Sequence, residues 1–144
     1  GLVELTRQAG AEVEILSLAT EPKCWRSWIT TLGIPMTLKP DAHLVLGTEA
    51  DEAHWWVEVD RGTESLPRIL AKCRTYLDYW RTGIEEAARG VFPKVLWVVP
   101  TERRRNQLIK ALHRLDAEDQ ILFAVSTDDQ ATSVLAGPGP EVAS

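Results

Sequence analysis

The stretch EVDRGTES, residues 58–65, lies where a predicted strand ends and a predicted helix begins. Glu58 and Asp60 are two positions apart, so on a strand both side chains point to the same face. Two neighbouring carboxylates repel each other, which favours raised pKa values unless a cation lies between them. A divalent metal ion or a set of Lys and Arg side chains meets this need. The stretch therefore predicts a charged site at the end of a strand.

The periodicity of apolar residues on both sides of this stretch predicts a mixed α/β fold. We expect strands at 12–20, 38–48, 53–60, 95–99 and 121–126, and helices at 2–8, 65–88 and 101–115. Residues 24–32 are expected to form a short helix or an irregular crossing, and 33–35 a turn. The order helix, three strands, helix, strand, helix, strand gives a mixed β-sheet with helices on both faces. Its second and third strands are expected to form a hairpin.

Composition agrees with a single domain of ordinary character. The chain has 144 residues, a formal net charge of −5 and 26% charged residues, which argues mildly against a broad nucleic-acid-coating surface. No run approaches the roughly 20 apolar residues that cross a bilayer. The first residues show no basic flank followed by an apolar stretch, the pattern of a signal peptide, so we expect a cytoplasmic protein that does not bind membranes. Cys24 and Cys73 are expected to be buried, reduced thiols. The chain starts without Met, and we expect further residues before Gly1.

Four acidic side chains are candidates for a metal site. If the second and third strands pair, Asp41 lies beside Glu58 at one end of the sheet. Two carboxylates with a backbone carbonyl and waters suit Mg²⁺ or Mn²⁺, which can polarise a phosphodiester and activate water. Asp60 and Glu21 could assist as further ligands or by positioning water. The alternative for each acid taken alone is an ordinary solvated position at a strand end or in a loop.

The helix that follows carries a stripe of polar residues. Glu64, Arg68, Lys72 and Tyr76 are spaced by four and therefore share one helical face. This face could lean over the carboxylates and place Lys72 near a metal-bound phosphate. The alternative is a surface ladder of ion pairs, each contributing a few tenths of a kcal/mol.

Other candidate residues give weaker signals. His43 shares strand parity with Asp41, but no second His or Cys at metal-ligand spacing supports it. Residues 103–105 are three consecutive arginines at a helix N-terminus, where positive charge is unfavourable, and we expect all three to face outward. Two interpretations of these arginines remain open: they contact phosphate groups, or they are ordinary solvent-exposed side chains. The sequence contains neither a Ser–His–Asp arrangement nor a Walker-type glycine loop.

The order of elements, with Pro40-Asp41 on one strand and Glu58 on the next, resembles the PD-(D/E)xK superfamily, which has the restriction-endonuclease-like fold. The resemblance implies metal-dependent phosphodiester cleavage, with Asp41 and Glu58 as metal ligands. The third motif position, a lysine in the superfamily, is Asp60 here. Some branches place a Gln-x-x-x-Tyr motif on the following helix, and Lys72 to Tyr76 resembles it, so Lys72 could replace the missing lysine.

The string from Glu58 to Ser65, followed by Lys72-x-x-x-Tyr76, is more narrowly similar to the replication-relaxation family of bacterial plasmids and conjugative elements. The similarity extends from about Glu14 to Gly137. It implies a nuclease-like domain at 1–137 with a loose tail at 138–144, and a preceding winged-helix region that this chain lacks. DNA, and other replication or transfer proteins, are the implied partners.

Two functions follow from these expectations. The first is a Mg²⁺- or Mn²⁺-dependent nuclease or nickase, in which Asp41 and Glu58 bind the metal, Glu21 and Asp60 assist, and Lys72 steadies the phosphate or the attacking water. The residues expected to contact DNA are Arg61, Arg68, Tyr76, Arg103 and Arg104. The second is a non-catalytic DNA-binding or protein-docking module of the same fold, in which Arg61 pairs with Glu58 or Asp60.

Overall fold

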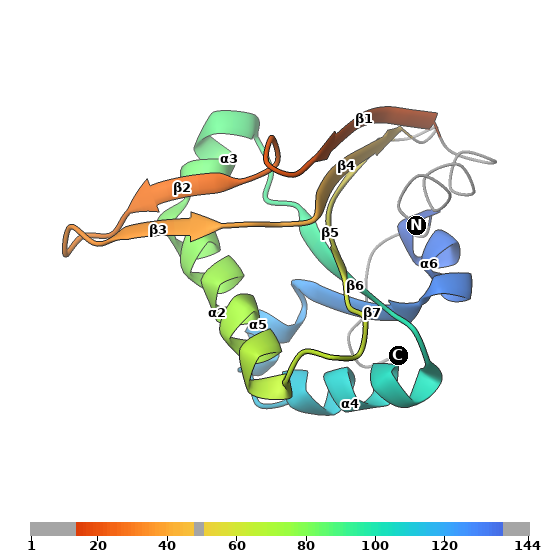
Figure 1. Ribbon diagram of the computed structural model, residues 1–144. Helices are drawn as coiled ribbons and strands as arrows, with labels where there is room; N and C mark the ends of the chain where they lie inside the picture. Colours follow the sequence, from red (N-terminus) through yellow and green to blue (C-terminus); the bar gives the residue numbers. More distant parts are fainter. Residues whose placement is uncertain (1–13, 48–50, 137–144) are drawn as a thin grey trace.

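A five-stranded mixed β-sheet forms the centre of the computed structural model, which describes residues 14–47 and 51–136 (Figure 1). Its strands, in spatial order, are β1 (Glu14–Thr20), β4 (Ala42–Gly47), β5 (Glu52–Val59), β6 (Lys94–Val99) and β7 (Phe123–Thr127). The first three pair antiparallel, and β5, β6 and β7 run parallel. The predicted mixed sheet is thus confirmed, whereas the expected helix at 2–8 lies outside the described residues.

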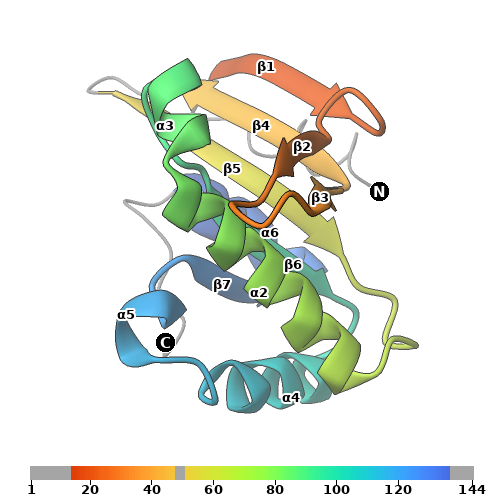
Figure 2. The same ribbon diagram turned by 90° about the vertical axis from the view of Figure 1, so that its left-hand side faces the viewer.

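Helices cover both faces of this sheet (Figure 2). They are α2 (Leu66–Thr82), α3 (Ile84–Arg89), α4 (Glu102–Leu112), α5 (Ala117–Gln120) and α6 (Asp128–Ala136). One core lies between the sheet and the α2 and α4 helices, and a second lies beneath α6. Trp55 and Trp56 are buried on opposite faces, one in each core, as the strand alternation dictates. None of the described helices is long and apolar enough to cross a membrane.

Pairing of β4 with β5 brings the predicted site residues together. Ala42 pairs with Val57 in this antiparallel ladder. Asp41 comes directly before β4's first residue, and Glu58 directly after Val57, so the two acids meet at the same end of the ladder. The predicted hairpin of the second and third strands is confirmed by this register.

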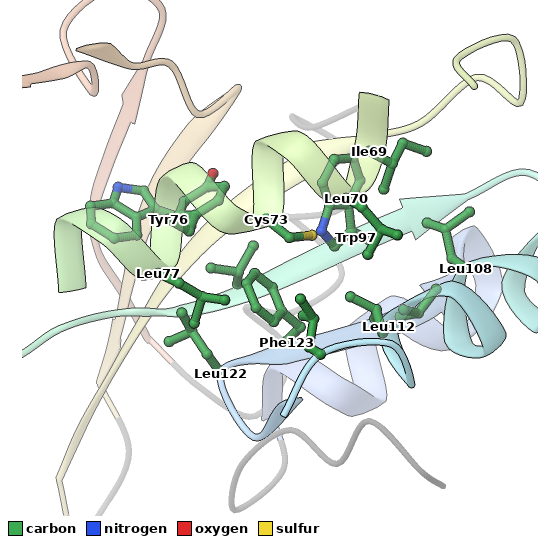
Figure 3. Close-up of a cluster of buried hydrophobic side chains, with 14 of the residues drawn as sticks. Ile69, Leu70, Cys73, Tyr76, Leu77, Trp97, Leu108, Leu112, Leu122 and Phe123 are labelled. Carbon is green, nitrogen blue, oxygen red and sulfur yellow. The ribbon is translucent and has the colours of Figure 1, made fainter. Parts of the chain in front are cut away.

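Helix α2 begins where its sequence indicates, but it ends earlier than expected. The Ser65 hydroxyl caps the helix by accepting a hydrogen bond from the Arg68 amide at 3.3 Å, and Pro67 occupies the first turn. Its apolar face packs on the sheet and on α4, where Cys73 and Leu77 lie close to Trp97 and Phe123 (Figure 3). The single helix expected at 65–88 is divided at Gly83, whose φ of 73° ends α2 and starts α3.

The segment at 24–32 differs from the sequence-based expectation. It forms neither a helix nor an irregular crossing, because β2 (Arg26–Ile29) and β3 (Pro35–Leu38) form a separate antiparallel hairpin. The predicted turn is present, with Gly33 at φ 81°. Arg26 fixes the hairpin to α3 through Glu85, with Nε 2.8 Å from Oε1 of this buried carboxylate. Helices α5 and α6 were also not predicted, since their apolar faces are short.

Candidate active site

A polar cavity of about 250 Å³ opens where β4 begins, β5 ends and α2 passes over them. Six of the predicted site residues line it: Asp41, Glu58, Asp60, Arg61, Arg68 and Lys72. Their positions in the sequence span 32 residues from first to last, and the β4–β5 ladder and the start of α2 bring them together. The prediction that the α2 stripe leans over the strand carboxylates agrees with this geometry.

Glu58 is the buried centre of the cavity, with 2% of its surface exposed. Lys72 Nζ donates to Glu58 Oε1 at 2.7 Å and also to the carbonyl of Lys39 at 3.1 Å. The Tyr76 hydroxyl donates to the other carboxylate oxygen, Oε2. Lys72 and Tyr76 are one helical turn apart, so α2 presents both donors to one carboxylate.

Burial raises the pKa of Glu58 to about 7, although the nearby ammonium of Lys72 and the hydrogen bond from Tyr76 favour its ionised form. The neighbouring Asp41 carboxylate raises this pKa further. Glu58 therefore changes charge near neutral pH. A carboxylate with this property in a polar cavity is typical of functional sites.

Tyr76 is fully buried, and burial together with Glu58 raises its pKa well above the usual value for tyrosine. It remains a protonated hydrogen-bond donor. A hydroxyl with no exposed surface cannot attack a phosphodiester, and the direct DNA contact expected of Tyr76 does not agree with this position. The structure places Tyr76 as the residue that orients Glu58.

Asp41 lies at the junction of the two strands. Its Oδ2 accepts a hydrogen bond of 2.7 Å from the Val59 amide, the first backbone donor after Glu58. This bond fixes the carboxylate over the end of β5 and beside Glu58. Sequence analysis identified Asp41 but gave no sign of this amide contact, because it depends on the strand register.

Asp60 has a structural partner. Arg104 on α4 donates from Nε to Asp60 Oδ2 at 2.7 Å and from Nη2 to Oδ1 at 3.1 Å, and its Nη2 also donates to the carbonyl of Glu64 at 2.7 Å. Hydrogen bonding to Asp60 raises the pKa of Arg104. The expectation that all three arginines at 103–105 face outward is therefore wrong for Arg104, which is buried against Asp60. It is also wrong for Arg105, whose side chain is mostly buried and donates to the Val125 carbonyl. No sequence signal links Asp60 and Arg104, which are 44 positions apart.

The remaining predicted residues lie around or away from the cavity. Arg61 is exposed, and the partners of Glu58 and Asp60 are Lys72 and Arg104 instead of Arg61. Arg68 is largely exposed, with Nε 3.4 Å from Glu64 Oε1. Glu21, Arg103 and His43 do not line the cavity. Burial lowers the pKa of His43 to about 4, and its ring lies near Trp56.

Two carboxylates, those of Asp41 and Glu58, are the cavity's candidate ligands for a divalent cation. The described residues contain no group of three or more His, Cys, Asp and Glu side chains that could enclose a metal ion. Asp41 and Glu58 supply two carboxylates, and each oxygen of an ionised carboxylate can accept more than one partner. Mg²⁺ commonly binds through one or two carboxylates, waters and a substrate phosphate. The residues present therefore fit such an ion only with external oxygen ligands.

Comparison with known proteins identifies the family. Searches of curated proteins and of solved structures found no match. The family model described as replication-relaxation matches residues 2–95, a segment that contains Asp41, Glu58, Lys72 and Tyr76. The chain therefore belongs to the replication-relaxation family, and this membership indicates a role in plasmid or conjugative-element replication or transfer, with DNA or replication proteins as partners.

Proposed function

We propose that this domain is a metal-dependent DNA nuclease or nickase with a restriction-endonuclease-like arrangement, in which a lysine from α2 replaces the lysine of the strand motif. The observation that carries the proposal is the 2.7 Å contact between Lys72 Nζ and Glu58 Oε1, within a cavity that Asp41 also lines. Asp60 is the residue at the strand position where the motif has lysine, and its carboxylate accepts two hydrogen bonds from Arg104. The positive charge beside Glu58 is thus the ammonium group of Lys72, on α2.

The residues of the cavity have distinct roles in this proposal. Asp41 and Glu58 would hold a Mg²⁺ or Mn²⁺ ion, which when bound polarises the scissile phosphate and lowers the pKa of a water molecule. Lys72 favours the ionised form of Glu58 and presents its remaining N–H to a phosphate oxygen or to the attacking water. Tyr76 fixes the orientation of Glu58. Exposed Arg61 and Arg68, at the rim, are placed to contact DNA phosphates.

Glu58 gives the proposal a pH dependence. Its pKa of about 7 means that a proton competes with the cation for this carboxylate near neutral pH. Cleavage should therefore increase as the pH rises through about 7, and high metal concentration should shift the profile to lower pH.

Nicking of supercoiled plasmid in Mn²⁺ tests the proposal. The test variants are Asp41→Asn, Glu58→Gln and Lys72→Met, and Arg74→Ala is a matched control because Arg74 is exposed on the same helix and outside the cavity. We expect the three test variants to lose about 100-fold or more of the cleavage rate and the control to retain it. Cleavage that survives both carboxylate substitutions, or that is absent from the unaltered chain, would falsify the nuclease proposal.

The second candidate is a non-catalytic DNA-binding or protein-docking module. Its support is that both oxygens of Glu58 already accept hydrogen bonds from Lys72 and Tyr76, so the buried acid is satisfied within the protein. In that case the chain binds DNA or a replication protein with the same affinity with and without divalent metal, and plasmid remains uncut.

A further inference from the structure

The basic cluster on α4 is divided by the fold into an internal and an external set. Arg104 turns inward to Asp60, and Arg105 donates to the Val125 carbonyl at 3.2 Å and to Glu102. Arg103, Lys110 and Arg114 are exposed, and none of them forms an ion pair with another described residue. Arg103 and Lys110 are seven residues apart and therefore share one side of α4, and Arg114 lies in the turn just after this helix ends at Leu112.

A groove of about 660 Å³ lies between this side of α4 and the first turn of α2. Its apolar surface comes from Leu66, Pro67 and Ala111, and its cationic edge from Lys110 and Arg114. No Asp or Glu among the described residues lines it. The chain has a net charge of −5, yet the charged side chains at this groove are the cations Lys110 and Arg114. A surface that only faces water usually carries both signs of charge, so this local excess of positive charge suggests an anionic partner.

The groove and the candidate active site share one helical turn. Glu64 and Arg68 line the cavity of the site, whereas Leu66 and Pro67, between them in the sequence, line the groove. Figure 2 shows the start of α2 lying beside α4, with which it is in contact. The cavity and the groove therefore draw their lining from neighbouring residues at the start of α2.

We propose that the groove binds the sugar–phosphate backbone of the DNA next to the cleavage site. The apolar surface fits the faces of deoxyribose rings. Lys110 and Arg114 at the groove, and Arg103 one helical turn before the lining residue Gln107, neutralise phosphates. This inference rests on the proposed function for its substrate, but it assigns a surface that lies outside the catalytic cavity. An acidic amphipathic peptide has similar chemistry, and we favour DNA because the groove adjoins a cavity suited to a phosphodiester.

The dependence of DNA affinity on salt concentration tests this surface. The variant Arg103→Ala/Lys110→Ala/Arg114→Ala removes three exposed charges, and the control Lys23→Ala/Arg74→Ala/Lys94→Ala removes three exposed charges that line neither the groove nor the cavity. Fluorescence anisotropy with a labelled duplex and a labelled single strand, in EDTA, gives binding without cleavage. Circular dichroism checks that both variants remain folded.

We expect the groove variant to lower the magnitude of the slope of log K against log[salt] by about 2–3 on its preferred DNA, since each lost phosphate contact removes about 0.9 on a duplex or 0.7 on a single strand. The control should change the slope by less than about 1. The probe with the larger change identifies the form of DNA that the groove holds.

Three results would overturn the inference. They are an unchanged slope in the groove variant, an equal change in both variants, and a groove variant that loses binding only to an acidic peptide probe. Because the assay contains no metal, it is independent of cleavage. If the groove variant has a smaller salt slope but the unaltered chain does not nick plasmid, the nuclease proposal is rejected and the groove inference stands. If the unaltered chain nicks plasmid but the slope of the groove variant is unchanged, the groove inference is rejected and the nuclease proposal stands.

Discussion

Arg104 on α4 holds Asp60 at the end of β5 with two hydrogen bonds, of 2.7 and 3.1 Å. The pair ties the loop before α2 to α4, since Arg104 also donates to the Glu64 carbonyl. In the proposed nuclease arrangement, this pair would make Asp60 a structural residue and leave Lys72 as the cation beside Glu58.

Breaking this pair should destabilise the fold. Arg104→Ala leaves the Asp60 carboxylate buried without a cation, and we expect the free energy of unfolding to fall by about 3–5 kcal/mol. Arg103→Ala, at the exposed neighbouring position, should change it by no more than about 0.5 kcal/mol. Urea denaturation measures both. Equal effects of the two substitutions would show that the Asp60–Arg104 pair contributes nothing specific.

Removing the Tyr76 hydroxyl should change the titration of Glu58. The hydrogen bond from Tyr76 favours the ionised carboxylate, so Tyr76→Phe should raise the pKa of Glu58 above its value of about 7. NMR titration of labelled glutamate side chains in EDTA measures the shift. Tyr79→Phe is a matched control, since the Tyr79 hydroxyl donates to Glu85 instead. A Glu58 pKa that does not move, or that moves equally in the control, contradicts the role given to Tyr76.

His43 should make the folded state sensitive to acid. Burial lowers its pKa to about 4, from 6.5 in the unfolded chain. Between these values the unfolded state binds a proton that the folded state does not, so this contribution to stability is complete above pH 6.5 and is lost as the pH falls toward 4. The loss is at most roughly 3 kcal/mol. Unfolding of His43→Gln, measured from pH 7 to 4, should show a smaller decline than the unaltered chain, and parallel curves would contradict this prediction.

Metal binding should depend on DNA. Asp41 and Glu58 alone leave most coordination positions to water, so Mn²⁺ should bind weakly to the chain and at least about tenfold more tightly when a DNA phosphate completes the shell. Calorimetry with a cleavage-resistant phosphorothioate duplex compares the two affinities. Asp41→Asn should remove the gain. Equal affinity with and without DNA would indicate a metal site that does not share its ligands with a phosphate.

Local sequence patterns were sufficient for the elements that carry the site. The alternation around Trp55 and Trp56 places β5, and the stripe from Glu64 to Tyr76 places α2, because strand and helix periods depend only on neighbouring residues. The pairing of Asp41 with Glu58 also followed from a short hairpin. The hairpin of β2 and β3 was missed, since its short strands gain stability from Arg26 and Glu85, which are 59 positions apart.

The sequence by itself determined which residues meet at the end of β5, namely Asp41, Glu58 and Lys72, since each lies on an element with a clear period. Only the tertiary structure decided what each of them does. Lys72 bonds to Glu58 because α2 crosses over the end of β5, and the Asp60 carboxylate is hydrogen-bonded to Arg104 because α4 packs beside the end of β5. Such choices among partners depend on burial and on distances between distant segments, and no local pattern in the chain encodes them.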